Sequence, residues 1–170
     1  MTYKLIYVCA NNKGRSVALA AYTEHFLKLN GIEEVEIYSG GIEHEMIESL
    51  KKREMYLASH NVRKVLKDEG IDVENHRIRH VEDIINDSNL ILVSDELSLI
   101  KTRFRFPEYK RKSFLAKKYA GYKNNLEIFG PYAESRTKRI GKDWTERDLY
   151  RDMLKETKVV AKRVVEELVK

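Results

Sequence analysis

Residues 3–16 read YKLIYVCANNKGRS, and this stretch decides the fold that the sequence predicts. Residues 3–8 are apolar and β-prone, and they run directly into Cys9. From Arg15 onward apolar residues recur at helical spacing, until Asn30 and Gly31 supply a stop signal. The predicted order is therefore a strand, a short loop at its carboxyl end, and a helix.

The rest of the chain alternates strands and helices in the same way. Further strands are predicted at 35–38, at 89–94 and, shorter, at 126–129, and helices at 57–69 and after Thr145. Thr145 and Asp148 have the spacing of a capping box, which marks the start of the last helix. This alternation predicts an α/β fold, a three-layer α/β/α arrangement with a four-stranded parallel sheet, and residues 1–170 are expected to form a single domain.

Ligands of parallel sheets bind outside the carboxyl ends of the strands. Four residues follow predicted strands at such ends: Cys9, Ser39, Asp95 and Gly130. Asp95 also suits the N-cap of a helix, and we favour that role over catalysis.

Composition narrows the class of protein. Hydrophobic residues make up 42% of the 170 residues and charged residues 35%, as expected for a soluble globular protein. Apolar runs fall well short of the roughly 18 to 20 residues that span a bilayer, and the start does not read as a signal peptide, so no membrane association and a cytoplasmic location are expected. A single cysteine excludes an intramolecular disulfide and a cysteine-rich metal site. The sequence does not fix an oligomeric state.

The net charge of +5 weakly favours anionic partners. The stretch 101–123 holds nine Lys or Arg residues, one acid, Glu108, and interleaved aromatic residues, so nucleic-acid binding is one alternative. We favour the other interpretation, a solvated helical face with aromatic residues packed inward, and consider nucleic acid an unlikely partner.

The loop after the first strand carries the chemistry: a cysteine, five residues, an arginine and a hydroxyl. Backbone N–H groups of residues 10–15 at a helix N-terminus can bind a phosphate dianion, and the planar guanidinium of Arg15 can hold two of its oxygens. The same groups favour the thiolate form of Cys9, and the Ser16 hydroxyl can stabilise it. Asn11, Asn12 and Gly14 tolerate the positive φ that a tight loop needs. The alternative is a structural, buried cysteine.

These segments resemble those of the low-molecular-weight protein tyrosine phosphatases over most of the chain. Residues 8–16 match that family's signature loop, and 39–41 (SGG) resemble its Ser-Ala-Gly segment. Residues 65–79 are similar to its stretch ending in His-Arg-Ala-Arg, and 89–95 (NLILVSD) to its Asp-Leu-Ile-Leu-Val-Met-Asp.

The resemblance implies a phosphocysteine intermediate on Cys9, with Arg15 holding the phosphoryl group and Ser16 tuning the thiolate. It implies that Asn12 maintains the loop through hydrogen bonds with Ser39 and His76. The phosphate-binding residues are then Ala10, Asn11, Asn12, Lys13, Gly14 and Arg15. No metal or cofactor is implied, and the expected substrates are phosphotyrosine proteins or other aryl phosphates.

The likeness fails at the family's general acid, an aspartate in an Asp-Pro pair usually followed by an aromatic residue. Here Gly130 stands in its place, although Pro131 and Tyr132 match the pattern and Tyr132 is expected to line the substrate cleft. Losing such an acid lowers the rate by about 10² to 10⁴. Glu127, Glu134 and Asp143 are nearby carboxylates, of which Glu134 is our candidate replacement.

A second departure is Gly14, where many relatives carry a second cysteine that protects the nucleophile through a disulfide. With one cysteine, that protection and a self-contained arsenate-reductase chemistry are both excluded. Our leading hypothesis is a cysteine-dependent phosphomonoesterase, a protein tyrosine phosphatase of reduced rate or with a displaced acid. A catalytically impaired phosphate- or phosphoprotein-binding module is the first alternative, and a nucleic-acid-binding protein the second.

Overall fold

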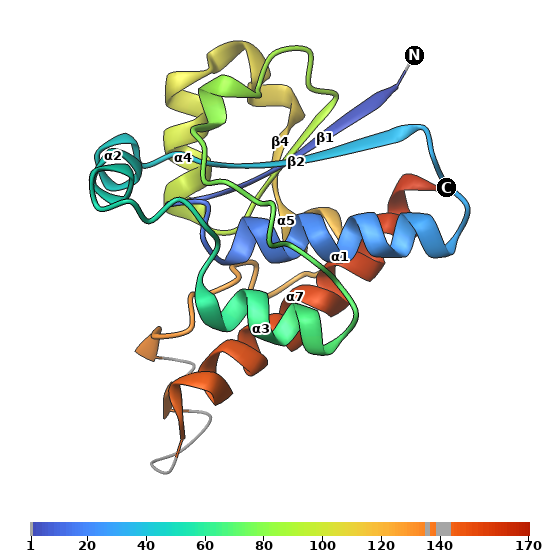
Figure 1. Ribbon diagram of the computed structural model, residues 1–170. Coiled ribbons are helices and arrows are strands. Elements are labelled where there is room, and N and C mark those ends of the chain that lie inside the picture. The colour runs from blue at the N-terminus through green and yellow to red at the C-terminus, as the bar shows by residue number, and fades with distance from the viewer. Residues whose placement is uncertain (1, 135–136, 139–143) are drawn as a thin grey trace.

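The sheet of the computed structural model, which describes residues 2–134, 137–138 and 144–170, has four parallel strands. They are β1 (Tyr3–Cys9), β2 (Val35–Gly41), β3 (Leu90–Val93) and β4 (Ser113–Leu115), in the spatial order β2-β1-β3-β4 (Figure 1). The chain passes from β1 to β2 on one side and later to β3 on the other, so the strand order reverses between β1 and β3. Such a reversal is where ligands bind in open α/β sheets.

Helices cover both faces of the sheet, as the three-layer prediction requires. They are α1 (Arg15–Leu29), α2 (His44–Lys52), α3 (His60–Asp68), α4 (Glu96–Arg105), α5 (Ala116–Tyr119) and α7 (Glu146–Leu168), with 3-10 turns η1 (Val81–Asp83) and η2 (Pro107–Lys112). The α1 and α7 helices pack together on one face, and α3 and α5 contact α7 there. Helix α4 packs with β3, β4 and η2 on the other face.

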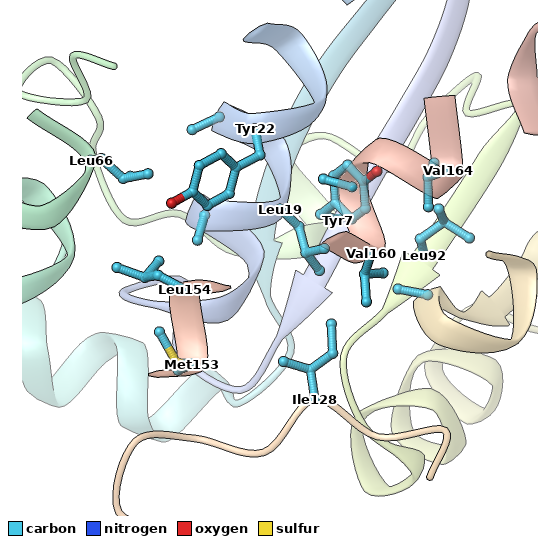
Figure 2. Close-up of a cluster of buried hydrophobic side chains, with 14 of the residues drawn as sticks. Tyr7, Leu19, Tyr22, Leu66, Leu92, Ile128, Met153, Leu154, Val160 and Val164 are labelled. Carbon is cyan, nitrogen blue, oxygen red and sulfur yellow. The ribbon is translucent and has the colours of Figure 1, made fainter. Parts of the chain in front are cut away.

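Alternate side chains of β1 pack into the hydrophobic clusters on the two opposite faces of the sheet. Leu5 and Tyr7 belong to the larger core cluster, shared with α1, α3 and α7, whereas Ile6 and Val8 belong to the smaller cluster on the opposite face. Figure 2 shows Tyr7 among Leu19, Val160 and other side chains of the larger cluster. A strand covered on both faces must be apolar at successive positions, which is the pattern that the sequence has.

The prediction of the fourth strand at 126–129 is wrong, because Ser113–Leu115 pairs with β3 instead. Ile128 nevertheless donates its backbone N–H to the Ser94 carbonyl at 2.7 Å, and its side chain is fully buried in the core (Figure 2). The apolar pattern at 126–129 therefore reflects the burial of the Ile128 side chain, and these residues do not form a strand of the sheet. Helix α2, which is short and buries only Ile47 and Leu50, was not among the predicted helices.

Helix α7 begins as predicted. The Thr145 side chain accepts from the Asp148 backbone N–H, and Asp148 accepts from the Thr145 backbone N–H in return, which forms the capping box. Leu149, Met153, Val160 and Val164 of this helix are fully buried. Among the described residues, no helix combines the length and the apolar character that crossing a membrane requires.

Candidate active site

Residues Cys9–Ser16, called the phosphate loop below, join β1 to α1 at the carboxyl edge of the sheet. Cys9 ends β1, is 1% exposed and is a free thiol. Ser16 lies in the first turn of α1 and is fully buried, with its Oγ 3.0 Å from the Cys9 Sγ. The Asn12 side-chain N–H donates to this Oγ at 3.0 Å, and the serine hydroxyl keeps its own O–H, which can donate to a Cys9 thiolate.

Asn12 holds the phosphate loop from inside. Its Nδ2 also donates to Ser39 Oγ at 2.9 Å, and its Oδ1 accepts from the Arg79 backbone N–H at 3.1 Å. Both amide donors and the acceptor are therefore used in a fully buried position. Asn12 adopts the left-handed conformation (φ 56°), whereas Gly14 has a φ of −136°, so the loop takes its positive φ at the asparagine and not at the glycine.

His76 supports the same residue through the Asn12 backbone carbonyl, with Nε2 at 3.2 Å from that oxygen. Burial lowers the pKa of His76 to about 4, with the charges of Arg79 and Arg77 acting in the same direction against the opposing effect of the hydrogen bond. The imidazole is therefore neutral near pH 7, and its Nε2–H is the donor to the Asn12 carbonyl.

Backbone hydrogen bonds tie the phosphate loop to two neighbouring segments. Ile42 and Glu43 donate to the carbonyls of Cys9 and Ala10 at 3.0 and 2.9 Å, and Ser59 donates to the carbonyl of Lys13 at 2.9 Å. Gly41 makes this approach possible, since a Cβ there would lie 2.8 Å from the Ala10 oxygen. These loop carbonyls thus have partners outside the loop.

Arg15 begins α1 and reaches across the carboxyl edge of the sheet. Its Nη1 donates to Asp95 Oδ2 at 2.8 Å and to the Ile128 carbonyl at 3.1 Å. Asp95 is also the N-cap of α4, because its side chain accepts from the Ser98 backbone N–H, as the sequence suggested. Burial raises the pKa of Asp95, but the Arg15 charge and the bonds from Ser98 and Ser94 outweigh it, and the net pKa lies below its ordinary value.

A cleft of about 750 Å³ opens above the phosphate loop. Its wall includes six residues of the phosphate loop, which are Cys9, Ala10, Asn11, Lys13, Gly14 and Arg15, together with Gly130 and with Tyr132, which was expected to line it. The apolar part of the lining includes Met46, Leu50, Met55, Pro131, Tyr150 and Met153. Partial burial and then the charges of Arg53 and Arg63 lower the pKa of Lys13, which indicates a concentration of positive charge beside the loop.

The carboxylates considered for the missing acid lie in different places. Glu134 does not line the cleft, and its carboxylate pairs with Lys138 at 2.5 Å, where both side chains are at least 74% exposed. Glu127 accepts from the Glu96 backbone N–H at the start of α4, and Asp143 lies outside the described residues. A Cβ placed on Gly130 would meet no atom within 4 Å, so the position itself is spacious.

Glu146, which the sequence analysis missed, does line the cleft. It lies in the first turn of α7 and accepts a hydrogen bond from the Tyr132 hydroxyl. That bond, with burial as the next cause, raises the pKa of Tyr132, and the Tyr132 ring meets the Tyr150 ring edge-on at 6.0 Å. The capping box of Thr145 and Asp148 predicts where α7 begins. It does not predict that α7 packs beside residues 130–132, and this packing is what brings Glu146 to the site.

Most of the basic side chains in the stretch 101–123 form hydrogen bonds or ion pairs with other parts of the protein. Arg103, Arg105 and Lys112 donate to backbone carbonyls, Lys101 bonds Glu43, and Lys117 is buried against Glu156 and two carbonyls. Most of its aromatic side chains pack against the cores, while Phe104 is 86% exposed. This arrangement favours the packed helical face over a nucleic-acid interface.

Comparison with protein families places the chain in a class of phosphatases. The model of the family described as low molecular weight phosphotyrosine protein phosphatase matches residues 4–170, and the chain belongs to this family. A comparison with the sequences of curated proteins found no match.

Solved structures agree on the fold. A YwlE mutant from Bacillus subtilis superimposes with a TM-score of 0.77 at 18% identity, covering 99% of this chain and 100% of that one. The low molecular weight protein tyrosine phosphatase of T. tengcongensis gives 0.74 at 21% identity, covering 97% and 99%. The YwlE arginine phosphatase of Geobacillus stearothermophilus gives 0.72 at 24% identity, covering 98% and 93%.

Proposed function

We propose that this chain hydrolyses phosphate monoesters, with phosphotyrosine or other aryl phosphates as substrates, through a phosphocysteine on Cys9. The observation that carries the proposal is the contact of 3.0 Å between Cys9 Sγ and Ser16 Oγ at the start of α1, in a chain that belongs to this phosphatase family. A thiolate at that position lies at the end of the helix where the dipole favours negative charge.

In the proposed first step the Cys9 sulfur attacks phosphorus, the P–O bond to the aryl group breaks, and the phenolate leaves with a proton from an acid. In the second step the conjugate base of that acid takes a proton from water as the water attacks the phosphocysteine, the P–S bond breaks, and inorganic phosphate and the Cys9 thiolate are released. The Ser16 hydroxyl stabilises the thiolate as nucleophile in the first step and as leaving group in the second.

Binding of the phosphoryl group is assigned to the backbone N–H groups of residues 10–15 and to the Arg15 guanidinium. The contacts of Arg15 with Asp95 and Ile128 both involve Nη1, so within the described residues the guanidinium is oriented through one nitrogen. A guanidinium carries five N–H donors, which leaves donors for two phosphoryl oxygens.

Two carboxylates compete for the role of acid. Glu134 is the candidate from the sequence, but its exposed pair with Lys138 lies outside the cleft lining. Glu146 lines the cleft with Cys9 and Gly130, and it is hydrogen-bonded to Tyr132. We therefore assign the proton transfer to Glu146.

The test is steady-state hydrolysis of aryl phosphates with graded leaving groups, from p-nitrophenyl phosphate to phosphotyrosine, by the wild type, Glu146→Gln and Glu134→Gln. Glu146→Gln should lower kcat for phosphotyrosine by about 10²-fold and leave p-nitrophenyl phosphate much less affected, because a poor leaving group depends most on the acid. Glu134→Gln is the matched control and should change neither rate. Equal losses in both variants would contradict the assignment.

Cys9→Ser supplies the baseline, and phosphoarginine is included because one structural neighbour is an arginine phosphatase. If neither ester is cleaved while inorganic phosphate still binds, the chain is a phosphate-binding module and the enzymatic proposal fails. Turnover of phosphoarginine alone would move the substrate class from aryl esters to phosphoramidates.

A further inference from the structure

A cluster of two histidines and a glutamate, His44, Glu48 and His80, lies outside the residues that line the cleft. His44 and Glu48 are one helical turn apart on α2, and His80 directly precedes η1. One donor atom from each of the three residues lies within 4.8 Å of the others. Two imidazoles and a carboxylate are a donor set that binds Zn²⁺ in proteins.

The three side chains already contact one another. His80 Nε2 lies 2.7 Å from Glu48 Oε1, and the rings of His44 and His80 stack with centroids 4.4 Å apart. The His80 side chain is 7% exposed, whereas that of His44 is 56% exposed and can turn. Ligands of a tetrahedral zinc ion lie about 3.3 Å apart, so from separations of at most 4.8 Å a shift of up to about 1.5 Å by the exposed histidine would close the set.

Glu82 provides an independent observation at the same place. Its Oε1 lies 3.4 Å from His44 Nδ1, while its Oε2 is buried and makes no hydrogen bond within the described part of the chain. A buried carboxylate oxygen without a partner is destabilising, and a bound cation, or the N–H of a metal-bound histidine, would remove that cost.

Two cations compete for these carboxylates. Lys51 contacts Glu48 Oε1 at 3.1 Å, and Arg105 contacts Glu82 Oε1 at 3.4 Å. Both contacts use Oε1, the oxygen that in Glu48 also contacts His80 and in Glu82 contacts His44, so a bound ion would compete with Lys51 and Arg105 for these atoms.

We propose that His44, Glu48 and His80 form a binding site for one Zn²⁺ ion, with Glu82 as a fourth ligand or as the acceptor of a ligand histidine. The site is structural and lies apart from the reaction proposed for Cys9. It links α2 to η1, and Met46 and Leu50 of the same helix line the cleft, so the bound ion would fix one wall of the cleft.

The test is a titration of chelator-treated protein with Zn²⁺ by isothermal titration calorimetry, in a Cys9→Ser background that removes the thiolate as a competing ligand. One ion per chain is expected, with a rise in Tm on saturation. His44→Ala should weaken binding at least about tenfold, and Glu48→Gln should act in the same direction. The matched control, His25→Ala on α1, should leave binding unchanged.

His44 is exposed, so its variant tests the site without the risk of misfolding that His80→Gln carries. Co²⁺ substitution gives a second readout, since visible absorption should appear in the Cys9→Ser protein and disappear in Cys9→Ser/His44→Ala. Failure to bind Zn²⁺ at one ion per chain, or equal binding by the His44→Ala and His25→Ala proteins, would overturn the proposal.

Discussion

The phosphate loop and the segment Gly130–Glu134 border the same cleft but are built differently. In the phosphate loop Cys9, Asn12 and Ser16 are at most 1% exposed, and hydrogen bonds reach the loop from β2, from Ser59 and from His76 and Arg79. In Gly130–Glu134 the Tyr132 side chain is 58% exposed, and Glu134 pairs with an equally exposed lysine.

This difference separates two tasks of the proposed reaction. The groups that bind phosphate and activate sulfur are held in place by several buried hydrogen bonds to the surrounding segments. The groups that transfer a proton lie on an exposed surface with room around Gly130, where one carboxylate can be exchanged for another at little cost to the fold. The following predictions test that separation, beginning with the largest effect.

Arg15→Lys should lower kcat/KM for p-nitrophenyl phosphate by about 10³-fold, because lysine cannot hold two phosphoryl oxygens in a fixed plane. The control is Arg63→Lys on α3, whose guanidinium pairs with Glu74 and does not line the cleft. Steady-state kinetics of both variants give the comparison, and a loss below tenfold for Arg15→Lys would remove that residue from the proposed chemistry.

Gly130→Asp should restore the acid in a protein that lacks Glu146. We expect Glu146→Gln/Gly130→Asp to recover about 10²-fold in kcat for phosphotyrosine over Glu146→Gln, since a Cβ at 130 meets no neighbour. Gly130→Asn in the same background matches the size without the ionisable group and should recover nothing. Recovery by the asparagine variant would mean that shape and not proton transfer limits the rate.

Asn12→Ala should destabilise the protein by about 3 kcal/mol, because it leaves the buried Ser16, Ser39 and the Arg79 backbone N–H without their partner. Asn11→Ala, which removes a single bond of 3.3 Å to the Lys13 N–H, is the control and should cost less than about 1 kcal/mol. Urea denaturation measures both. Similar losses would show that the two asparagines support the loop equally.

The lowered pKa of His76 predicts that the stability of the protein depends on pH. Its pKa of about 4 in the folded protein lies below the value near 6.5 of an unfolded chain, so between these values the unfolded state binds more protons. The free energy of unfolding should therefore fall by about 3 kcal/mol as the pH drops from 6.5 to 4. The difference between wild type and His76→Gln in urea denaturation at several pH values isolates this contribution, and parallel curves would contradict it.

Much of the fold was predictable because its signals are local. Residues 5–8 and 90–93 are apolar at successive positions, as strands buried on both faces must be, and Thr145 with Asp148 marks the start of α7. The fourth strand was not predictable in this way. Ser113–Leu115 is a three-residue strand after a basic turn, with no pattern of its own, while the buried Ile128 imitates a strand at 126–129.

The same distinction between local signals and long-range packing applies to the candidate site. Cys9, Arg15 and Ser16 lie within one short segment, so their spacing alone brings them together at the start of a helix. Glu146 comes from a distant element, and its approach to Gly130 depends on how α7 packs against α1. Glu134 lies near Gly130 in sequence, but of the two glutamates only Glu146 lines the cleft in the fold.

The most direct test of the central claim is mass spectrometry of the intact protein, rapidly mixed with p-nitrophenyl phosphate and quenched with acid. The account predicts a transient species heavier by one phosphoryl group, attached at Cys9 and absent in Cys9→Ser. Turnover of the ester without any phosphorylated protein, or with the phosphoryl group on another residue, would contradict the role given to Cys9.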